Sequence, residues 1–134
     1  MTPRRSWILA ILYMAGLFAL SSVPDDPKKP GLGAYFPPPQ LQNALHVPAY
    51  AGLSFLMWRG LRGPKKTLAQ RHAPLLAAAL ATVYGALDEV HQMFVVGRTP
   101  SVTDALANAL GAFAVAGCVL LLSRRAPGPP TLPS

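Results

Sequence analysis

The residues of this chain that could do chemistry gather in one stretch, from Tyr84 to Asn108. Charged and polar side chains end one apolar run there and open the next, with a turn containing glycine and proline between them. They are Asp88, Glu89, His91, Gln92, Arg98, Asp104 and Asn108. Carboxylates and imidazoles act as general acids and bases, and a guanidinium holds a phosphate by two parallel hydrogen bonds. The stretch therefore predicts a polar site between two apolar helices.

The composition indicates that this polar site belongs to a membrane protein. Of 134 residues, 51% are hydrophobic and 13% are charged, which is outside the usual range for soluble domains. The net charge of +7 does not indicate nucleic-acid binding, because the basic residues stand in small groups without interleaved aromatic residues. Cys118 is the single cysteine, so an intrachain disulfide and a cysteine metal cluster are excluded, and we expect it to pack within its apolar run.

Four apolar runs predict an all-α fold in which four transmembrane helices form one bundle. The expected helices are about 7–23, 41–61, 74–93 and 104–123, in one domain over 1–123, and 124–134 is expected to be a disordered tail. The third run is apolar only as far as Leu87, so a span of about 20 residues must include Asp88 to Gln92 in its last two turns. A Pro-rich loop is expected over 24–40.

The first apolar run has a second interpretation as a cleaved signal peptide. Arg4 and Arg5 precede it and small residues end it, which fits the signal-peptide pattern. Cleavage would leave three transmembrane helices with unchanged orientation.

The basic residues predict that orientation. All of them except Lys28, Lys29 and Arg98 fall on the side that holds both termini and the 62–73 loop. Because Lys and Arg favour the cytoplasmic side, we expect both termini in the cytoplasm. The polar site is then at the opposite, extracytoplasmic surface of a multi-pass protein.

Helical spacing gathers polar side chains from three helices at a similar depth, since residues three, four or seven apart share a face. The faces are Tyr84 with Asp88, His91 and Gln92; Asp104 with Asn108 and Gly111; and His46 with Tyr50 and Leu53. Ionisable groups at membrane depth are costly on the lipid side, so these faces should turn into the bundle. Gly85, Gly111 and Ala112 would allow close helix contact there.

At these residues the chain resembles the VanZ-like family of bacterial membrane proteins. Asp88, Glu89 and Gln92, then Gly97 and Arg98, then Asp104, Asn108 and Gly111 are similar to the family's D-E-x-x-Q, G-R and D-x-x-x-N-x-x-G elements in order and spacing. His46 and Tyr50 resemble its H-x-x-x-Y element, and Ser21-Ser22 with Pro24 its serine-rich end of the first helix. The family often has Asp-Lys where this chain has Gln42 and Asn43, so no role of that pair is carried over.

The resemblance covers about residues 7–122 and implies four membrane helices in the bacterial cytoplasmic membrane. Through the family's founding member it implies a link to resistance to teicoplanin, a lipoglycopeptide that acts at the cell envelope. It names a cellular context and no reaction.

Binding is the function that we favour from the sequence. The ligand would be a membrane lipid, a lipid-linked envelope precursor or a lipoglycopeptide, with Arg98 holding phosphate. The ligand-binding candidates are His46, Tyr50, Asp88, Glu89, Gln92, Arg98, Asp104 and Asn108. Two alternatives stay open: a membrane-embedded enzyme acting on a lipid headgroup, and a structural subunit of an envelope complex. The sequence predicts no oligomeric state.

Catalysis would use a carboxyl group as general acid or base beside an imidazole. The catalytic candidates are Asp88, Glu89, His46 and His91. No G-x-S-x-G nucleophile motif occurs, and Ser21, Ser22 and Ser101 have no evident base. The histidines and carboxylates lack the tight spacing of a motif such as H-E-x-x-H, so we expect neither a metal nor a cofactor.

Several of these residues also have a purely structural interpretation. Asp104 can complete a capping box with Ser101, and Arg98 can pair with Asp104 to fix the turn. His91 can interact with the carboxyl end of its helix, and Asn108 can bridge two helices.

Overall fold

The computed structural model describes residues 1–25, 39–63 and 68–125 of the chain. Its helices are α1 (Pro3–Ser21), α2 (Pro39–Leu61), α3 (Leu68–Arg71), α4 (Ala73–Gln92) and α5 (Val102–Arg125). No strand occurs within the described ranges, so the predicted all-α class is confirmed for them. Most of the expected 24–40 loop and of the expected 124–134 tail lies outside the described residues.

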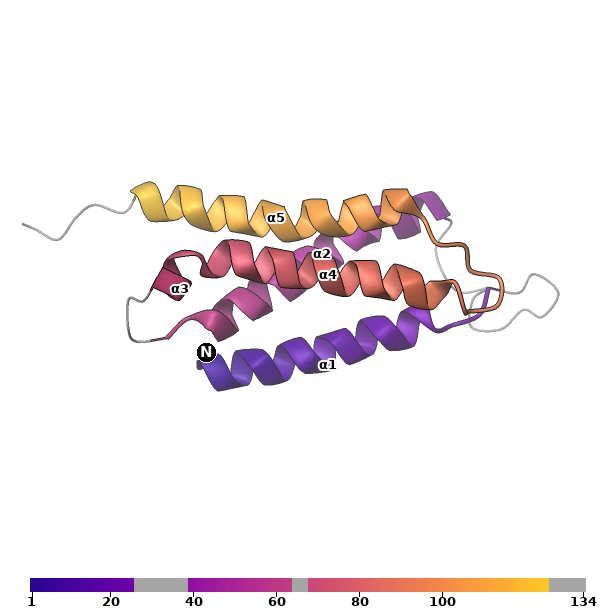
Figure 1. Ribbon diagram of the computed structural model, residues 1–134, viewed down its shortest axis with the longest axis horizontal. Coiled ribbons are helices and arrows are strands. Elements are labelled where there is room, and N and C mark those ends of the chain that lie inside the picture. Colours follow the sequence, from indigo (N-terminus) through magenta and orange to yellow (C-terminus); the bar gives the residue numbers. More distant parts are fainter. Residues whose placement is uncertain (26–38, 64–67, 126–134) are drawn as a thin grey trace, which may run out of the picture.

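The four long helices lie side by side and alternate in direction, and α3 is a single turn that leads into α4 (Figure 1). Helix α2 packs against α1, α4 and α5, and α5 also packs against α4. Helix α1 lies at one side of the bundle, where it contacts α2 and, less extensively, α4.

Capping groups explain why two helices begin earlier than the expected bounds. At α1, Thr2 is the N-cap and its hydroxyl accepts a hydrogen bond from the Arg5 amide at 3.4 Å, so the helix starts at Pro3. At α5, the Ser101 hydroxyl accepts from the Asp104 amide at 3.3 Å, which starts the helix at Val102. A capping side chain thus extends each helix to residues that precede its apolar run.

Small residues fill the interior of the bundle, and large apolar residues cover its outside. The buried positions are Ala10, Ala77, Ala78, Ala81, Ala112 and Ala116, together with Tyr50, Leu53 and Met57. Ile11 and Leu12 of α1, Leu87 of α4 and Leu122 of α5 are among the exposed large side chains. Globular proteins in water usually bury their large apolar residues, so this distribution is inverted.

Two glycines set the spacing between helices. A side chain at Gly111 of α5 would collide with the carbonyl oxygen of Val47 in α2. A Cβ at Gly85 of α4 would stand 2.8 Å from Cε1 of Tyr50 and 2.9 Å from Nδ2 of Asn108. The close approach predicted at these two glycines is therefore confirmed.

Two of the described helices are individually long and apolar enough to cross a membrane. They are α4 over Ala73–Gln92, with a mean hydropathy of 1.3, and α5 over Val102–Arg124, with a mean hydropathy of 2.2. Buried helices of soluble proteins can share that length and composition, so a four-span bundle with cytoplasmic termini stays a prediction.

The two ends of the bundle differ in charge. The end that holds the N-terminus carries Arg4, Arg5, Arg59, Arg62, Arg71 and Arg124. There the Arg59 guanidinium donates to the Met1 carbonyl at 3.3 Å. The opposite end holds the carboxylates Asp88, Glu89 and Asp104 together with Arg98.

Candidate functional site

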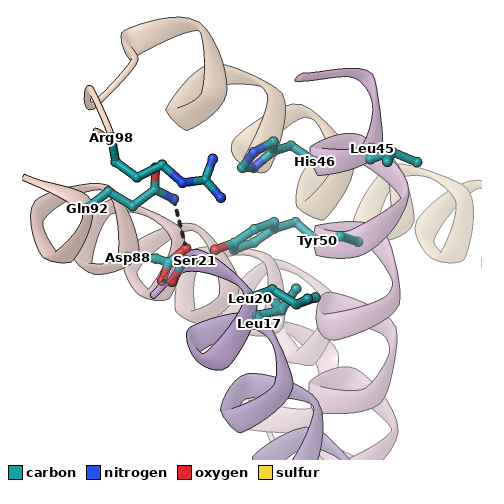
Figure 2. A pocket seen from close by; sticks show the side chains of 10 residues that line it. Leu17, Leu20, Ser21, Leu45, His46, Tyr50, Asp88, Gln92 and Arg98 are labelled. Carbon is teal, nitrogen blue, oxygen red and sulfur yellow. Dashed lines mark hydrogen bonds between the residues drawn. The ribbon is translucent and has the colours of Figure 1, made fainter. Parts of the chain in front are cut away.

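A pocket of about 170 Å³ opens between α1, α2 and α4 at the carboxylate-bearing end of the bundle. Its lining consists of Leu17, Leu20, Ser21, Leu45, His46, Ala49, Tyr50, Asp88, Gln92 and Arg98 (Figure 2). His46, Tyr50, Asp88, Gln92 and Arg98 were each predicted as binding residues, and the fold brings them to this one pocket. Leucines from α1 and α2 form its apolar part.

Asp88 is buried in the pocket wall, with 6% of its surface exposed. The Ser21 hydroxyl donates to Asp88 Oδ1 at 2.6 Å, and the Gln92 amide group donates to Oδ2 at a long 3.5 Å. Ser21 also lies 3.0 Å from the Phe18 carbonyl, but its single proton favours the shorter contact with the carboxylate. Asp88 is thus held by neutral donors among the described residues.

The side chain of Tyr50 lines this pocket and carries a hydroxyl group. The residue is 1% exposed, and its hydroxyl forms no hydrogen bond within the described part of the chain. The hydroxyl points toward Asp88 and Ser21, and the ring stacks on His46 with centroids 6.3 Å apart (Figure 2). Buried polar atoms usually have partners, so this hydroxyl indicates a place for a polar ligand group or a water.

Arg98 reaches the pocket from the turn between α4 and α5. Gly97 has a φ of +80°, and a side chain there would collide with the backbone of Asp25, so the turn fits closely against the residues after α1. The Asp25 amide donates to Val96 at 3.1 Å, and Arg98 Nε donates to the Val23 carbonyl at 3.4 Å. These contacts hold the guanidinium over the pocket (Figure 2).

A second cluster of polar residues lies beside the pocket, between α2, α4 and α5. His46 Nδ1 is 2.8 Å from Asn108 Oδ1, so the ring donates to the amide in the tautomer protonated at Nδ1. Glu89 Oε2 accepts from the Ser101 amide at 3.0 Å. Asn108 Nδ2 and Glu89 Oε1 are buried and have no hydrogen-bond partner among the described residues. Of this group, His46 alone also lines the pocket.

Glu89 completes the cap of α5. In the predicted capping box, the Ser101 hydroxyl should accept from the Asp104 amide while the Asp104 carboxylate accepts from the Ser101 amide. The first bond is present, but the Ser101 amide donates to Glu89 on the preceding helix. Glu89 therefore joins α4 to the start of α5, and neither Glu89 nor Asp104 lines the pocket.

The sequence of the chain matches one known protein family. The sequence model of the VanZ/LLP1 family matches residues 5–123, from the first turn of α1 almost to the end of α5. The chain belongs to the VanZ/LLP1 family. No match was found among curated proteins or among solved structures.

The VanZ/LLP1 elements seen in the sequence meet at one end of the fold. The element around Asp88 and Gln92 supplies the polar wall of the pocket, and His46 with Tyr50 faces it from α2. The serine-rich end of α1 supplies Ser21, which the sequence did not single out as a binding residue. Its place in the serine-rich element was the signal that could have found it. Leu17, Leu20, Leu45 and Ala49 were also missed, because apolar residues on apolar helices give no such signal.

His91 contacts α1 outside this pocket. Its Nε2 is 3.0 Å from the Ser22 hydroxyl, and its ring lies 4.3 Å from that of Phe18. The expectation that Ser21 and Ser22 have no nearby base was therefore wrong, because the end of α1 packs on α4 and brings Ser21 to Asp88 and Ser22 to His91. Ser22 donates its single proton to the Phe18 carbonyl at 2.6 Å, so the imidazole acts as a donor to Ser22. This arrangement does not activate Ser22 as a nucleophile.

The described residues include His, Cys, Asp and Glu side chains, which can bind metals. Within residues 1–25, 39–63 and 68–125, no three His, Cys, Asp or Glu side chains lie close enough to share a metal ion. Cys118 is exposed on α5, so the expectation that it packs inside was wrong. The outward position follows from the helix face it occupies, opposite to buried Ala116.

Proposed function

We propose that this VanZ/LLP1 protein is a multi-pass protein of the bacterial cytoplasmic membrane that binds an envelope lipid in the pocket between α1, α2 and α4. The observation that carries the proposal is the composition of the pocket, in which a leucine wall faces a polar wall. The buried hydroxyl of Tyr50, which has no hydrogen-bond partner among the described residues, lies in the polar wall. A molecule with an apolar chain and a polar headgroup matches both walls.

The apolar side chains on the surface of the bundle support the proposal that the protein lies in a membrane. Large apolar side chains on α1, α4 and α5 face outward, and alanines lie inside. Lipid tails are as apolar as leucine, so outward leucines cost little there and small residues let the helices approach. α1 and α2 have 19 and 23 residues. They are about 28 and 34 Å long, which compares well with a hydrocarbon core of about 30 Å.

The charge difference between the ends supports an orientation. Basic residues favour the cytoplasmic side, so the arginine-bearing end, where α1 begins and α5 ends, is cytoplasmic in this proposal. The pocket then opens at the extracytoplasmic surface, within reach of lipids and lipid-linked precursors of the cell envelope. By binding such a lipid or precursor, the protein would contribute to resistance against lipoglycopeptides such as teicoplanin.

The polar wall suits a phosphate-bearing headgroup. The Arg98 guanidinium provides the planar, forked donor geometry that matches phosphate oxygens. The Tyr50 hydroxyl and the Gln92 amide add neutral donors, and Leu17 and Leu20 lie where the first methylene groups would pass. Nucleophilic catalysis by Ser22 is disfavoured, because this serine lies beside an imidazole but directs its proton to its own helix.

Native mass spectrometry of the protein, extracted from bacterial membranes in mild detergent, tests the proposal. We expect one retained lipid per chain, identified by fragmentation. Ala49→Phe places a ring in the pocket lining and should reduce retention. Ala114→Phe makes the same change on the exposed face of α5 and should not. Folded wild-type protein that retains no lipid would overturn the proposal.

A further inference from the structure

We propose that the bound lipid carries a primary ammonium group beside its phosphate, that this ammonium pairs with Asp88, and that one acyl chain lies in a groove between α1 and α2. The inference rests on the proposed function and names the lipid class: phospholipids with an ethanolamine headgroup. Its two parts depend on different observations, which are the partners of Asp88 and the shape of the α1–α2 surface.

Asp88 is a buried carboxylate whose partners are all neutral. It accepts from the Ser21 hydroxyl and from the Gln92 amide, and it forms no ion pair with a described residue. A buried charge is costly unless a counterion accompanies it, and carboxylates at membrane depth are usually paired. Oδ2 has one contact, the 3.5 Å one with Gln92, so it has capacity to accept more. An ammonium group of the ligand would supply both the missing positive charge and the donor.

The same pocket also presents Arg98, whose charge is opposite to that of Asp88. A headgroup with separate negative and positive groups can therefore place its phosphate beside Arg98 and its ammonium beside Asp88 in a pocket of about 170 Å³. A glycerol headgroup would leave Asp88 without a counterion. A choline headgroup has positive charge but no N–H to donate to the carboxylate. Phosphate with a primary ammonium meets both requirements.

An apolar groove continues from the pocket along α1 and α2. This open groove of about 570 Å³ is lined by Leu12, Tyr13, Gly16, Leu17, Leu20, Leu45, Pro48 and Ala49. Leu17, Leu20, Leu45 and Ala49 also line the pocket, so the two spaces are adjoining. Between Leu20 and Leu12 the groove extends about 12 Å along the helix axis. An acyl chain that extends from a headgroup in the pocket would enter this groove directly.

Gly16 of α1 lines the groove, and its surroundings are open. A Cβ built at this glycine meets no atom within 4 Å. Gly117 of α5 has equally open surroundings but lines neither the pocket nor the groove. A bulky residue at either position therefore causes no clash at its Cβ, and a bulky residue at Gly16 occupies the space that the acyl chain would use. The two glycines make a matched pair for testing the groove.

The headgroup is tested by lipid competition on the wild-type protein. Native mass spectrometry after delipidation and exchange into equimolar dioleoyl phosphatidylethanolamine, phosphatidylglycerol and phosphatidylcholine reports the lipid retained. We expect about tenfold more ethanolamine lipid than either competitor, the size of one hydrogen bond to a charged group. N-acetyl phosphatidylethanolamine keeps the phosphate and loses the ammonium charge. Its retention should fall to that of phosphatidylglycerol.

Variants then test the contact between the ammonium and Asp88 and the position of the acyl chain in the groove. In Asp88→Asn, the ratio of retained ethanolamine lipid to phosphatidylglycerol should fall to about one, because the amide offers no negative charge to the ammonium. A ratio measured in one sample does not depend on the folded fraction. Gly16→Phe should reduce retention of all three lipids, while Gly117→Phe should retain them as wild type does. Thermal unfolding of each variant checks that the bundle is intact.

The outcomes separate this inference from the proposed function. Wild-type protein that retains no lipid would refute both. Retention without preference for the ethanolamine headgroup, or an unchanged preference in Asp88→Asn, would refute the ammonium pairing and leave lipid binding in place. Equal retention by Gly16→Phe and Gly117→Phe would refute the groove.

Discussion

The Ser21 hydroxyl donates a hydrogen bond of 2.6 Å to Asp88 Oδ1, and so joins the last residue of α1 to the last two turns of α4. Two further contacts join the same helices: Tyr84 donates to the Met14 carbonyl at 2.7 Å, and Ser22 lies 3.0 Å from His91. Helix α1 thus completes the pocket that the proposed function needs. These contacts therefore favour a first helix that is retained over a cleaved signal peptide.

Replacing Ser21 by alanine should destabilise the bundle. The variant leaves the buried carboxylate of Asp88 with one long contact, and hydrogen bonds to charged groups contribute about 1.5 to 3 kcal/mol. We expect the free energy of unfolding of Ser21→Ala to fall by about that amount. In Ser21→Ala with Asp88→Asn the loss should be smaller than the sum of the two single effects, since the partners are coupled.

A matched control for this cycle is Ser123→Ala. The Ser123 hydroxyl is exposed and bonds to the Val119 carbonyl of its own helix, so its loss should change stability by no more than about 0.5 kcal/mol. Unfolding in detergent micelles measures all four variants. Additive effects of Ser21→Ala and Asp88→Asn would show that this hydrogen bond contributes nothing to stability.

Glu89 should respond differently to glutamine and to alanine. Glutamine keeps an oxygen that can accept from the Ser101 amide and removes a buried charge, so the melting temperature of Glu89→Gln should stay near that of wild type. Alanine removes the acceptor, and loss of a helix cap costs about 0.5 to 2 kcal/mol. If both variants melt like wild type, Glu89 does not cap α5.

Arg98→Lys separates phosphate binding from charge alone. Lysine keeps the positive charge and loses the forked geometry, so we expect lipid retention to fall about tenfold, the size of one charge-assisted hydrogen bond. Arg62→Lys at the exposed, opposite end serves as the control and should retain lipid normally. Native mass spectrometry compares the two. Wild-type retention by a stably folded Arg98→Lys would rule out the phosphate contact.

Cysteine labelling tests the orientation. In a Cys118→Ala background, Thr99→Cys should react with a thiol reagent that cannot cross the membrane, because Thr99 is exposed at the pocket end. His72→Cys, exposed at the arginine-bearing end, should react only after the membrane is permeabilised. The opposite labelling pattern would place the pocket in the cytoplasm.

Helical periodicity correctly predicted which side chains share a helix face at the pocket. Gln92 was expected to share a face with Asp88, and the two side chains are in contact at 3.5 Å. His46 and Tyr50 were likewise expected on one face, and their rings stack. These relationships depend on spacing within one helix, which a sequence contains directly.

Relationships between helices could not be predicted in this way. Asp88 and Glu89 were both predicted as ligand-binding residues, but adjacent residues point about 100° apart around a helix. Asp88 therefore reaches Ser21 on α1, whereas Glu89 reaches Ser101 before α5. These partners depend on how the bundle packs. The apolar groove was missed because its leucines cannot be told from the other exposed leucines of the bundle by residue type.

Photocrosslinking tests the central claim, that a lipid binds in this pocket, most directly. A phospholipid with a photoreactive group on its first acyl carbons would be bound to the protein, irradiated, and its adducts assigned by peptide mass spectrometry. We expect adducts concentrated on Leu17, Leu20 and Leu45, which line the pocket. Adducts spread equally over exposed leucines such as Leu87 and Leu122 would contradict the claim, because they would show ordinary contact with surrounding lipid.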